Sequence, residues 1–329
     1  MQLIPTTVSG RIYTGILLLL AIAPLIFSLL EQPFYLGLLN RALILAIAAL
    51  SLNLILGFGG MVSLGHAAYI GIGAYSVGIA AYYDFYNGWL HIALALSVSA
   101  VFALITGAIS LRTKGVYFIM ITMAFSQMVY FTFLSLEEYG ADDGLVIYQR
   151  SEFPDWLSME SNTQLYYWTF ALLLLTLGFI HRLVHARFGK VIIGAKHNET
   201  RMQSLGFNTY RYRLTCYVLS AMICSLAGVL LGNFTSFISP DMIGWARSGE
   251  LIFMVIIGGV STLFGPMIGT IAFVLLEEFL SKITVYWHLI FGGLLVALVL
   301  FGKGGIDGWL QRRNQPPAAK TATQGADHD

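Results

Sequence analysis

The chain has 329 residues, of which 57% are hydrophobic and 11% are charged, and its formal net charge is +1. Soluble domains carry about 25% charged residues, so this composition excludes an ordinary soluble domain and predicts one membrane domain that crosses the bilayer several times. The near-neutral charge and the lack of a basic stripe with interleaved aromatic residues give no sign of nucleic-acid binding.

Runs of about 20 mostly apolar residues mark the expected membrane-spanning helices. They lie near residues 11–30, 39–56, 61–82, 90–111, 116–134, 164–179, 214–237 and 285–301. The apolar segments 251–261 and 265–280 are either two more crossings, for ten helices, or a re-entrant pair, for eight crossings. The predicted fold is therefore an all-α polytopic membrane protein of about ten transmembrane or re-entrant helices with glycine-interrupted segments.

Two polar segments of opposite charge predict the orientation. Residues 136–163 carry seven acidic side chains against Arg150 alone, and residues 181–213 carry seven Lys or Arg side chains against Glu199 alone. Lys and Arg accumulate on cytoplasmic loops. We therefore expect 136–163 to be periplasmic, 181–213 to be cytoplasmic, and both termini to be cytoplasmic. The membrane domain is expected to cover 1–306, followed by a disordered cytoplasmic tail at 307–329.

Glycine interrupts the otherwise apolar stretch 53–81 at seven positions, and a similar run recurs at 258–265. A glycine in a helix costs roughly 1 kcal/mol relative to alanine, so such a cluster needs a compensating cause. Close packing of helix backbones is one cause, and a broken helix beside a water-filled path is the other. The candidate path or packing residues are Gly59, Gly60, Ser63, Gly65, His66, Gly258, Gly259, Ser261 and Gly265. For His66 the two roles stay equally open.

The basic segment contains a short candidate helix. Asn198 is a good N-cap residue, Gly206 can end the helix in a left-handed conformation, and Met202 and Leu205 lie one turn apart. A small apolar face with basic flanks predicts a coupling helix that lies in a groove of a partner protein. The alternative is a solvated loop that binds lipid headgroups. The candidate coupling residues are Lys190, Lys196, Asn198, Glu199, Arg201, Met202, Leu205 and Gly206.

The motif that starts at Asn53 reads N-x-x-x-G-F-x-G-x-x-S-L-G-H-x-A-Y. It is followed by the sequence Ile72-Gly73-Ala74-Tyr75. Together with glycine-containing blocks at 189–206, 219–240, 257–269 and 301–306, it resembles the membrane subunits of branched-chain amino acid ABC importers of the LivM type. The resemblance covers about residues 50 to 306. This chain departs from the family pattern at Arg201-Met202, where the family usually has two alanines. The departure affects the contacts with which the segment is expected to dock on its partner.

The resemblance implies a permease subunit in a bacterial inner membrane that gives hydrophobic, branched-chain amino acids a translocation path. Its implied partners are a second related permease, two ATP-binding cassette ATPase subunits and a periplasmic substrate-binding protein. The chain has no phosphate-binding G-x4-G-K-[ST] loop. We therefore expect no enzyme activity, metal or cofactor in this chain, and we expect ATP and Mg²⁺ to be bound by the partner subunits.

Three alternatives stay open. A proton-coupled secondary carrier would use His66 with Glu277 or Glu278. A self-sufficient channel would need no energy source and no partner subunit. A third possibility is an ABC permease for urea, amides or aromatic acids. The sequence shows no charged pair within the expected spans, and ion-coupled carriers usually need embedded ionisable groups, so it argues against the first alternative. Cys216 and Cys224 are expected to be buried apolar residues.

Overall fold

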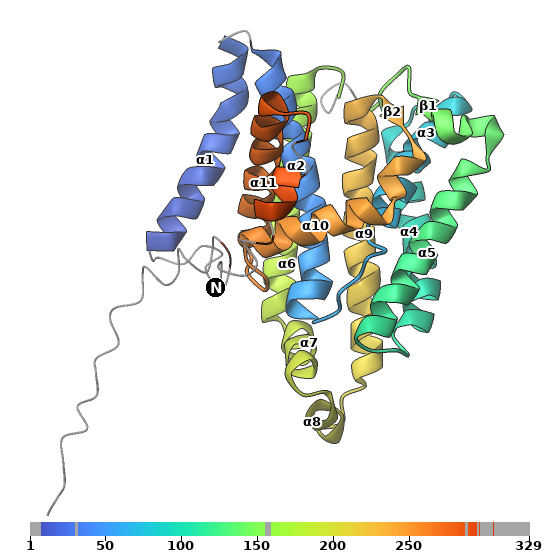
Figure 1. Ribbon diagram of the computed structural model, residues 1–329, viewed down its shortest axis with the longest axis vertical. Coiled ribbons are helices and arrows are strands. Elements are labelled where there is room, and N and C mark those ends of the chain that lie inside the picture. Colours follow the sequence, from blue (N-terminus) through green and yellow to red (C-terminus); the bar gives the residue numbers. More distant parts are fainter. Residues whose placement is uncertain are drawn as a thin grey trace, which may run out of the picture.

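Upright helices make up most of the protein in the computed structural model, which describes residues 8–29, 32–154, 159–286, 289–294, 296 and 305. Seven of them run roughly parallel (Figure 1): α1 (Val8–Leu29), α2 (Pro33–Asn53), α3 (Ala67–Tyr82), α4 (Gly88–Ser110), α5 (Val116–Leu134), α6 (Asn162–His185) and α9 (Thr209–Thr235). Among the described residues, five helices are long and apolar enough to cross a membrane: those that contain α2, α4, α5, α6 and α9. The predicted all-α membrane fold is thus confirmed.

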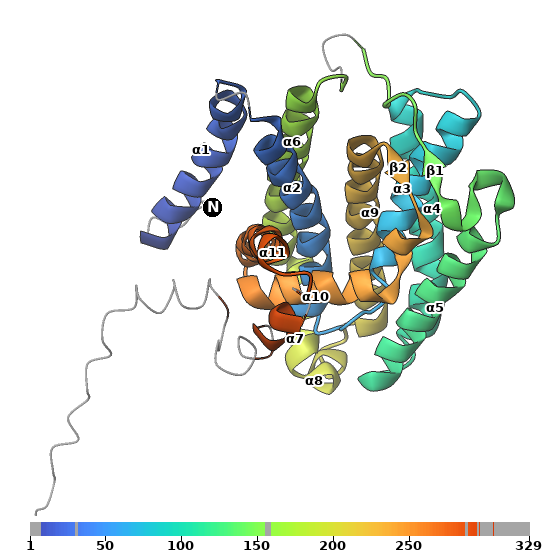
Figure 2. The same ribbon diagram turned by 45° about the horizontal axis from the view of Figure 1, so that its top comes forward.

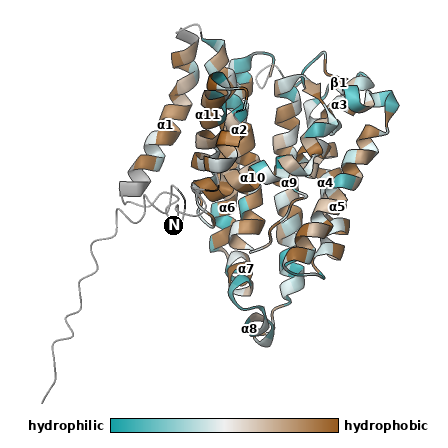
Figure 3. Ribbon diagram, viewed as in Figure 1, coloured by the Kyte–Doolittle hydropathy of each residue, from teal (hydrophilic) through white to brown (hydrophobic). Residues whose placement is uncertain are grey.

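Polar residues gather at the two ends of this bundle (Figure 3). One end, called the acidic end here, carries the short helices η2 (Glu137–Tyr139) and η3 (Ala141–Asp143) and the antiparallel strands β1 (Leu145–Val146) and β2 (Phe237–Ile238). The short helix η5 (Pro240–Ile243) lies deeper in the bundle, where the Ile243 carbonyl accepts from the Ser126 hydroxyl of α5. The opposite end, called the basic end, carries α7 (Arg187–His197) and α8 (Glu199–Ser204). The two charged segments therefore lie at opposite ends, as expected. Which end faces the cytoplasm stays a prediction.

Helix α3 is buried between α4, α9 and η5, and glycine makes this possible. A Cβ atom on Gly73 would clash with the Ser225 carbonyl of α9 and lie 3.0 Å from the Cα atom of Gly228. Small residues let helices approach this closely in a membrane. The glycines of α3 thus serve packing within this chain. Cys216 and Cys224 of α9 are buried and free, as predicted.

Helix α10 (Trp245–Gly258) lies across the upright helices, and α11 (Gly265–Ile283) then runs back toward the acidic end (Figures 1 and 2). Near the end of α11 the Lys282 ammonium lies 5.0 Å from the ring centre of Phe34, at the start of α2. The pair therefore has a re-entrant shape, and the choice between eight and ten crossings stays a prediction. A Cβ on Gly269 would clash with the Met254 carbonyl, so the G-x-x-x-G of α11 does serve close contact.

Two predicted helix starts need correction. Helix α10 begins at Trp245, six residues before the apolar segment expected at 251–261. Helix α3 begins at Ala67 and not near residue 61, because residues 59–66 form an irregular segment after the π-helical turn η1 (Leu54–Phe58). The expected last span at 285–301 lies only partly within the described residues, and the tail at 307–329 lies entirely outside them, so the number of crossings stays a prediction.

Candidate coupling and translocation site

The last turn of α2, which leads into the first glycine-rich break (residues 57–66), binds the second break (residues 258–265) through one amide side chain. Asn53, at the end of α2, donates to the carbonyl of Thr262 (2.8 Å) and accepts from the backbone N–H of Ser261 (3.1 Å). Ser261 has a φ of +68° and Gly259 a φ of +127°, so the second break has an irregular backbone that cannot satisfy itself as a helix would. Asn53, which is itself buried, satisfies both freed groups.

A further hydroxyl group closes the second break. The Thr262 hydroxyl donates to the Gly259 carbonyl (2.8 Å) and accepts from the backbone N–H of Gly265 (3.1 Å). A Cβ on Gly258 would clash with the Gly265 carbonyl, and one on Gly265 would clash with the Thr262 hydroxyl, so both ends of the second break must be glycine for the chain to turn this tightly. These contacts satisfy part of the interrupted backbone of the second break.

Lys196 ties the basic segment to both breaks. Its Nζ atom, on α7, donates to the Gly57 carbonyl (2.6 Å) and to the Ser261 hydroxyl (3.1 Å). The Ser261 hydroxyl itself donates to the same Gly57 carbonyl (2.7 Å). A Cβ on Gly60 would lie 2.8 Å from Lys196 Cγ, so the lysine stem also packs on the first break. One side chain of the basic segment therefore contacts both interrupted helices.

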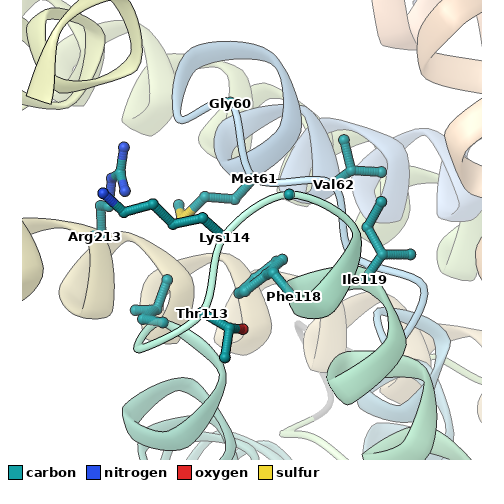
Figure 4. Close-up of a pocket in the computed structure, with 10 residues that line it drawn as sticks. Gly60, Met61, Val62, Thr113, Lys114, Phe118, Ile119 and Arg213 are labelled. Atoms are coloured by element: carbon teal, nitrogen blue, oxygen red, sulfur yellow. The ribbon is translucent and has the colours of Figure 1, made fainter.

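A pocket of about 170 Å³ lies beside the first break at the basic end (Figure 4). Gly60, Met61 and Val62 form one wall, and the turn between α4 and α5 forms the other. Lys114 of that turn extends toward Arg213 on one side of the pocket. Of the first-break candidates in the predicted set, only Gly60 lines this cavity. Gly59, Ser63, Gly65 and His66 are buried in the protein interior.

His66 belongs to a polar seam between α2, α3 and α9. Its Nε2 atom is 2.9 Å from the Ser51 hydroxyl and 3.4 Å from the Ser220 hydroxyl, and the residue is fully buried. Its Nδ1 atom has no hydrogen-bond partner among the described residues. These contacts give His66 a packing role, and a role in the path stays a prediction that no cavity in the described part supports.

The short helix of the basic segment forms as its end signals predict. The Asn198 side chain accepts from the backbone N–H of Arg201 (2.9 Å), which caps α8. Gly206 has a φ of +87°, and the Phe207 N–H reaches back to the Met202 carbonyl (3.2 Å), which ends the helix. Both predicted caps are confirmed, so the conformation of α8 is encoded locally.

Glu199 anchors this helix to the bundle. Its carboxylate lies 2.6 Å from Lys114 Nζ and 3.4 Å from Arg213 Nη1, and it accepts from the Thr209 hydroxyl (3.1 Å). Burial alone would raise the pKa of Glu199, but the hydrogen bond from Lys114 and the charge of Arg213 outweigh burial and lower the pKa. The sequence analysis named Glu199 without its partners, which come from the α4–α5 turn and from α9.

The outward face of the basic segment differs in part from the predicted one. Met202 is half-buried, and a Cβ on Gly194 of α7 would lie 2.8 Å from its sulfur, so Met202 packs inside the segment. The exposed apolar side chains are Leu205 (65% exposed) and Phe207 (38% exposed). Lys190 and Arg201 are also exposed. A partner that docks here would therefore contact Leu205 and Phe207, with cations on either side.

A charged pair joins α2 to α11, contrary to the expectation that the spans hold none. Arg41 Nη2 lies 3.0 Å and 3.3 Å from the two carboxylate oxygens of Glu277. Glu278 instead pairs with Lys282 on its own helix (3.0 Å). A lone arginine within an apolar span was a signal that sequence reasoning passed over. Its partner is 236 residues away, so no local pattern could identify the pair.

Comparisons with known proteins agree with this architecture. The family model described as "Branched-chain amino acid transport system / permease component" matches residues 34–300. The high-affinity branched-chain amino acid transport system permease protein LivM of Salmonella typhimurium is 25% identical over 324 residues, which cover 92% of this chain and 76% of the relative. LivM of Escherichia coli is 24% identical over the same length and the same shares. LivH of Escherichia coli is 29% identical over 126 residues, which cover 38% of this chain and 41% of the relative. No solved structure matches the chain.

Proposed function

The chain belongs to the family of permease components of branched-chain amino acid transport systems and is a permease subunit of an ABC importer, and we propose that it conducts hydrophobic, branched-chain amino acids. The substrate named for its relatives supports this proposal, and so do the apolar walls of the bundle. Urea, short amides and aromatic acids are the competing substrates. The choice between them depends on whether the path offers groups that recognise a carboxylate.

In this proposal the basic segment is where the transport cycle is driven. The observation that carries it is the Lys196 contact, because one side chain of α7 holds the Gly57 carbonyl and the Ser261 hydroxyl together. A partner that moves α7 and α8 would thereby shift both helix breaks at once. The pocket beside Gly60 gives the first break an open side on which such a shift could change access.

The assembly follows from this role. A second, related permease would complete the path, since LivM and LivH are separate permease proteins among the relatives. Two ATP-binding cassette subunits would bind ATP and Mg²⁺ and dock on Leu205 and Phe207 at the basic end. A periplasmic binding protein would deliver substrate at the acidic end. The protein would lie in the bacterial inner membrane with the basic end and both termini in the cytoplasm.

No observation favours the proton-coupled carrier. It would require His66 and Glu277 or Glu278 to exchange protons along a path. Each carboxylate instead has a basic partner, Arg41 for Glu277 and Lys282 for Glu278, and His66 is enclosed by the α2–α3–α9 seam. A membrane relay needs ionisable groups that face one another or a water-filled cavity, and the described part of the chain brings none of these three together in that way.

Reconstitution tests the proposal. The chain is co-expressed with its candidate permease, ATPase and binding-protein partners, purified, and placed in proteoliposomes that contain radiolabelled leucine outside and ATP with Mg²⁺ inside. We expect ATP-dependent leucine uptake, and we expect Arg201→Glu with Leu205→Ser, two exposed positions of the basic segment, to abolish uptake while membrane insertion stays normal. Full uptake in that variant would reject the coupling assignment. Uptake by the lone chain that follows a pH gradient and ignores ATP would reject the importer.

A further inference from the structure

A cavity of about 210 Å³ lies between α2, α3, α9 and the start of α10. Two arginines line it, Arg41 from α2 and Arg247 from the first turn of α10. Apolar side chains, among them Leu45, Phe234 and Met242, line the rest. Its volume is below the roughly 300–1,000 Å³ of pockets for drug-sized ligands, so it suits a molecule the size of a single amino acid.

Both guanidinium groups keep donors that no described residue uses. Glu277 contacts only the Nη2 atom of Arg41, so the Nη1 and Nε donors of Arg41 have no partner among the described residues. Arg247 contacts Glu250 through Nη1, so its Nη2 and Nε donors are likewise unused in this part of the chain. A guanidinium has five N–H donors in a planar fork that matches a carboxylate. The cavity is therefore lined by two guanidinium groups, and each of them has N–H donors that no described residue uses.

Structural needs alone explain Arg41 poorly. It lies eight residues into α2, which places it about 12 Å along the helix from Pro33 at 1.5 Å per residue. A charge at such a depth in a spanning helix is costly, and replacing a buried ion pair with apolar residues is often neutral or stabilising. An arginine at this depth that forms an ion pair and also lines a cavity has the features of a ligand-binding residue.

The charges in and around the cavity match a zwitterion. Arg41 with Glu277 and Arg247 with Glu250 are two neutral pairs, so the site has little net charge to attract a simple anion. A carboxylate can take the unused guanidinium donors, and the paired Glu277 and Glu250 carboxylates offset the two positive charges that would otherwise repel an ammonium group. An aliphatic side chain would lie against Leu45 and Phe234. Urea and neutral amides gain none of these charge-assisted hydrogen bonds.

We propose that this cavity is a substrate site in which Arg41 and Arg247 bind the carboxylate of a zwitterionic amino acid with an apolar side chain. The proposal rests on the proposed importer function and specifies its substrate class. The site lies on the acidic side of α10, the helix that runs across the bundle (Figures 1 and 2). Substrate released at the acidic end would therefore reach it before the two helix breaks.

Direct binding without the periplasmic protein tests the site, because that protein has its own specificity. The purified permease pair with its ATPase subunits is placed in nanodiscs, and equilibrium binding of radiolabelled leucine is measured up to millimolar concentration. We expect saturable binding that isocaproate, which keeps the carboxylate, reduces. Leucinamide and urea, which lack it, should not compete. Absence of saturable leucine binding, or equal competition by leucinamide, would overturn the proposal.

Two variants and one matched control locate the binding. Arg247→Gln should weaken leucine binding at least tenfold, because a charge-assisted pair of hydrogen bonds is lost. The double variant Arg41→Gln with Glu277→Gln should do the same without leaving an unpaired charge. The control is Glu278→Gln with Lys282→Gln, which removes a charged pair from the same helix α11 outside the cavity and should bind normally. Normal binding by both cavity variants, or equal loss in the control, would overturn the site.

The wild-type uptake assay separates this proposal from the importer function. ATP-dependent leucine uptake by the complete importer, together with no leucine binding to the nanodisc complex, would reject the cavity and keep the function. Uptake that is absent from the complete importer would reject the function itself. Leucine binding that depends on Arg247, together with uptake, would support both.

Discussion

At the basic end Lys196 and Glu199 are each bound by partners from more than one other segment, whereas in the acidic-side cavity Arg41 and Arg247 each have one partner and unused donors. A charged group that bonds to several segments of the protein fixes the position of the segments it joins. A charged group with free donors beside a cavity is available to a ligand. The same kinds of side chain thus serve mechanical connection at one place and recognition at the other.

The α3–α9 seam lies between these two regions, and disrupting it should have the largest effect because both regions depend on it. Gly73→Val would push a side chain into the Ser225 carbonyl and the Gly228 backbone. We expect a loss of about 3 kcal/mol of stability, measured as a lower melting temperature of the purified protein. Gly178→Val is the control, since a Cβ there meets nothing within 4 Å. An unchanged melting temperature for Gly73→Val would contradict the packing role.

The next largest effect should come from Lys196→Met, which keeps the apolar stem and removes the ammonium group. We expect leucine uptake to fall about tenfold, because charge-assisted hydrogen bonds of roughly 1.5–3 kcal/mol are lost. ATP hydrolysis should continue, since the docking face is untouched. Arg187→Met, at an exposed position of the same helix α7 that is not among the candidate coupling residues, should transport normally. Uptake that stays coupled to ATP in Lys196→Met would show that the Lys196 contact does not transmit motion from the basic segment to the helix breaks.

Docking is tested by the exposed apolar face. Leu205→Glu should reduce co-purification of the ATPase subunits severalfold, because it places a charge in a contact that the proposal makes apolar. Gln203→Glu is the matched control, as it adds the same charge to an exposed position of α8. Quantitative gel densitometry of the purified complex measures the ratio of subunits. Equal losses in the two variants would point to a general charge effect and against docking at Leu205.

The smallest effect concerns Glu199. Its pKa is lower in the folded protein than in the unfolded chain, so its contribution is present above the unfolded pKa and is lost as the pH falls through the folded pKa. The contribution is under about 1 kcal/mol, because Lys114 is largely exposed. We expect the protection factors of the amides in residues 199–206, which are corrected for the intrinsic pH dependence of exchange, to fall on acidification in the wild type but not in Glu199→Gln. The same fall in both would assign the pH response to another group.

Local signals were read correctly from the sequence. The caps of α8 at Asn198 and Gly206 depend on neighbouring residues, so they were predictable from the order of side chains alone. The opposite charges of the two polar segments and the small residues of α3 were similarly visible. Each of these features follows from what a residue type does to its own helix or to its own loop.

Distant contacts were not predictable in the same way. The sequence marked both glycine breaks, but only the folded chain shows that Asn53 joins them and that Lys196 points inward from a segment expected to face outward. The sequence also contains Arg41 and Glu277, but it gives no indication that they form an ion pair. The direction of α10 was equally unpredictable. A short apolar helix has the same sequence pattern whether it crosses a membrane or lies across a bundle. Composition and local spacing determine which segments enter the membrane and where they break. The pairing of segments far apart in the chain depends on how their side chains pack and satisfy one another, and that is decided only in three dimensions.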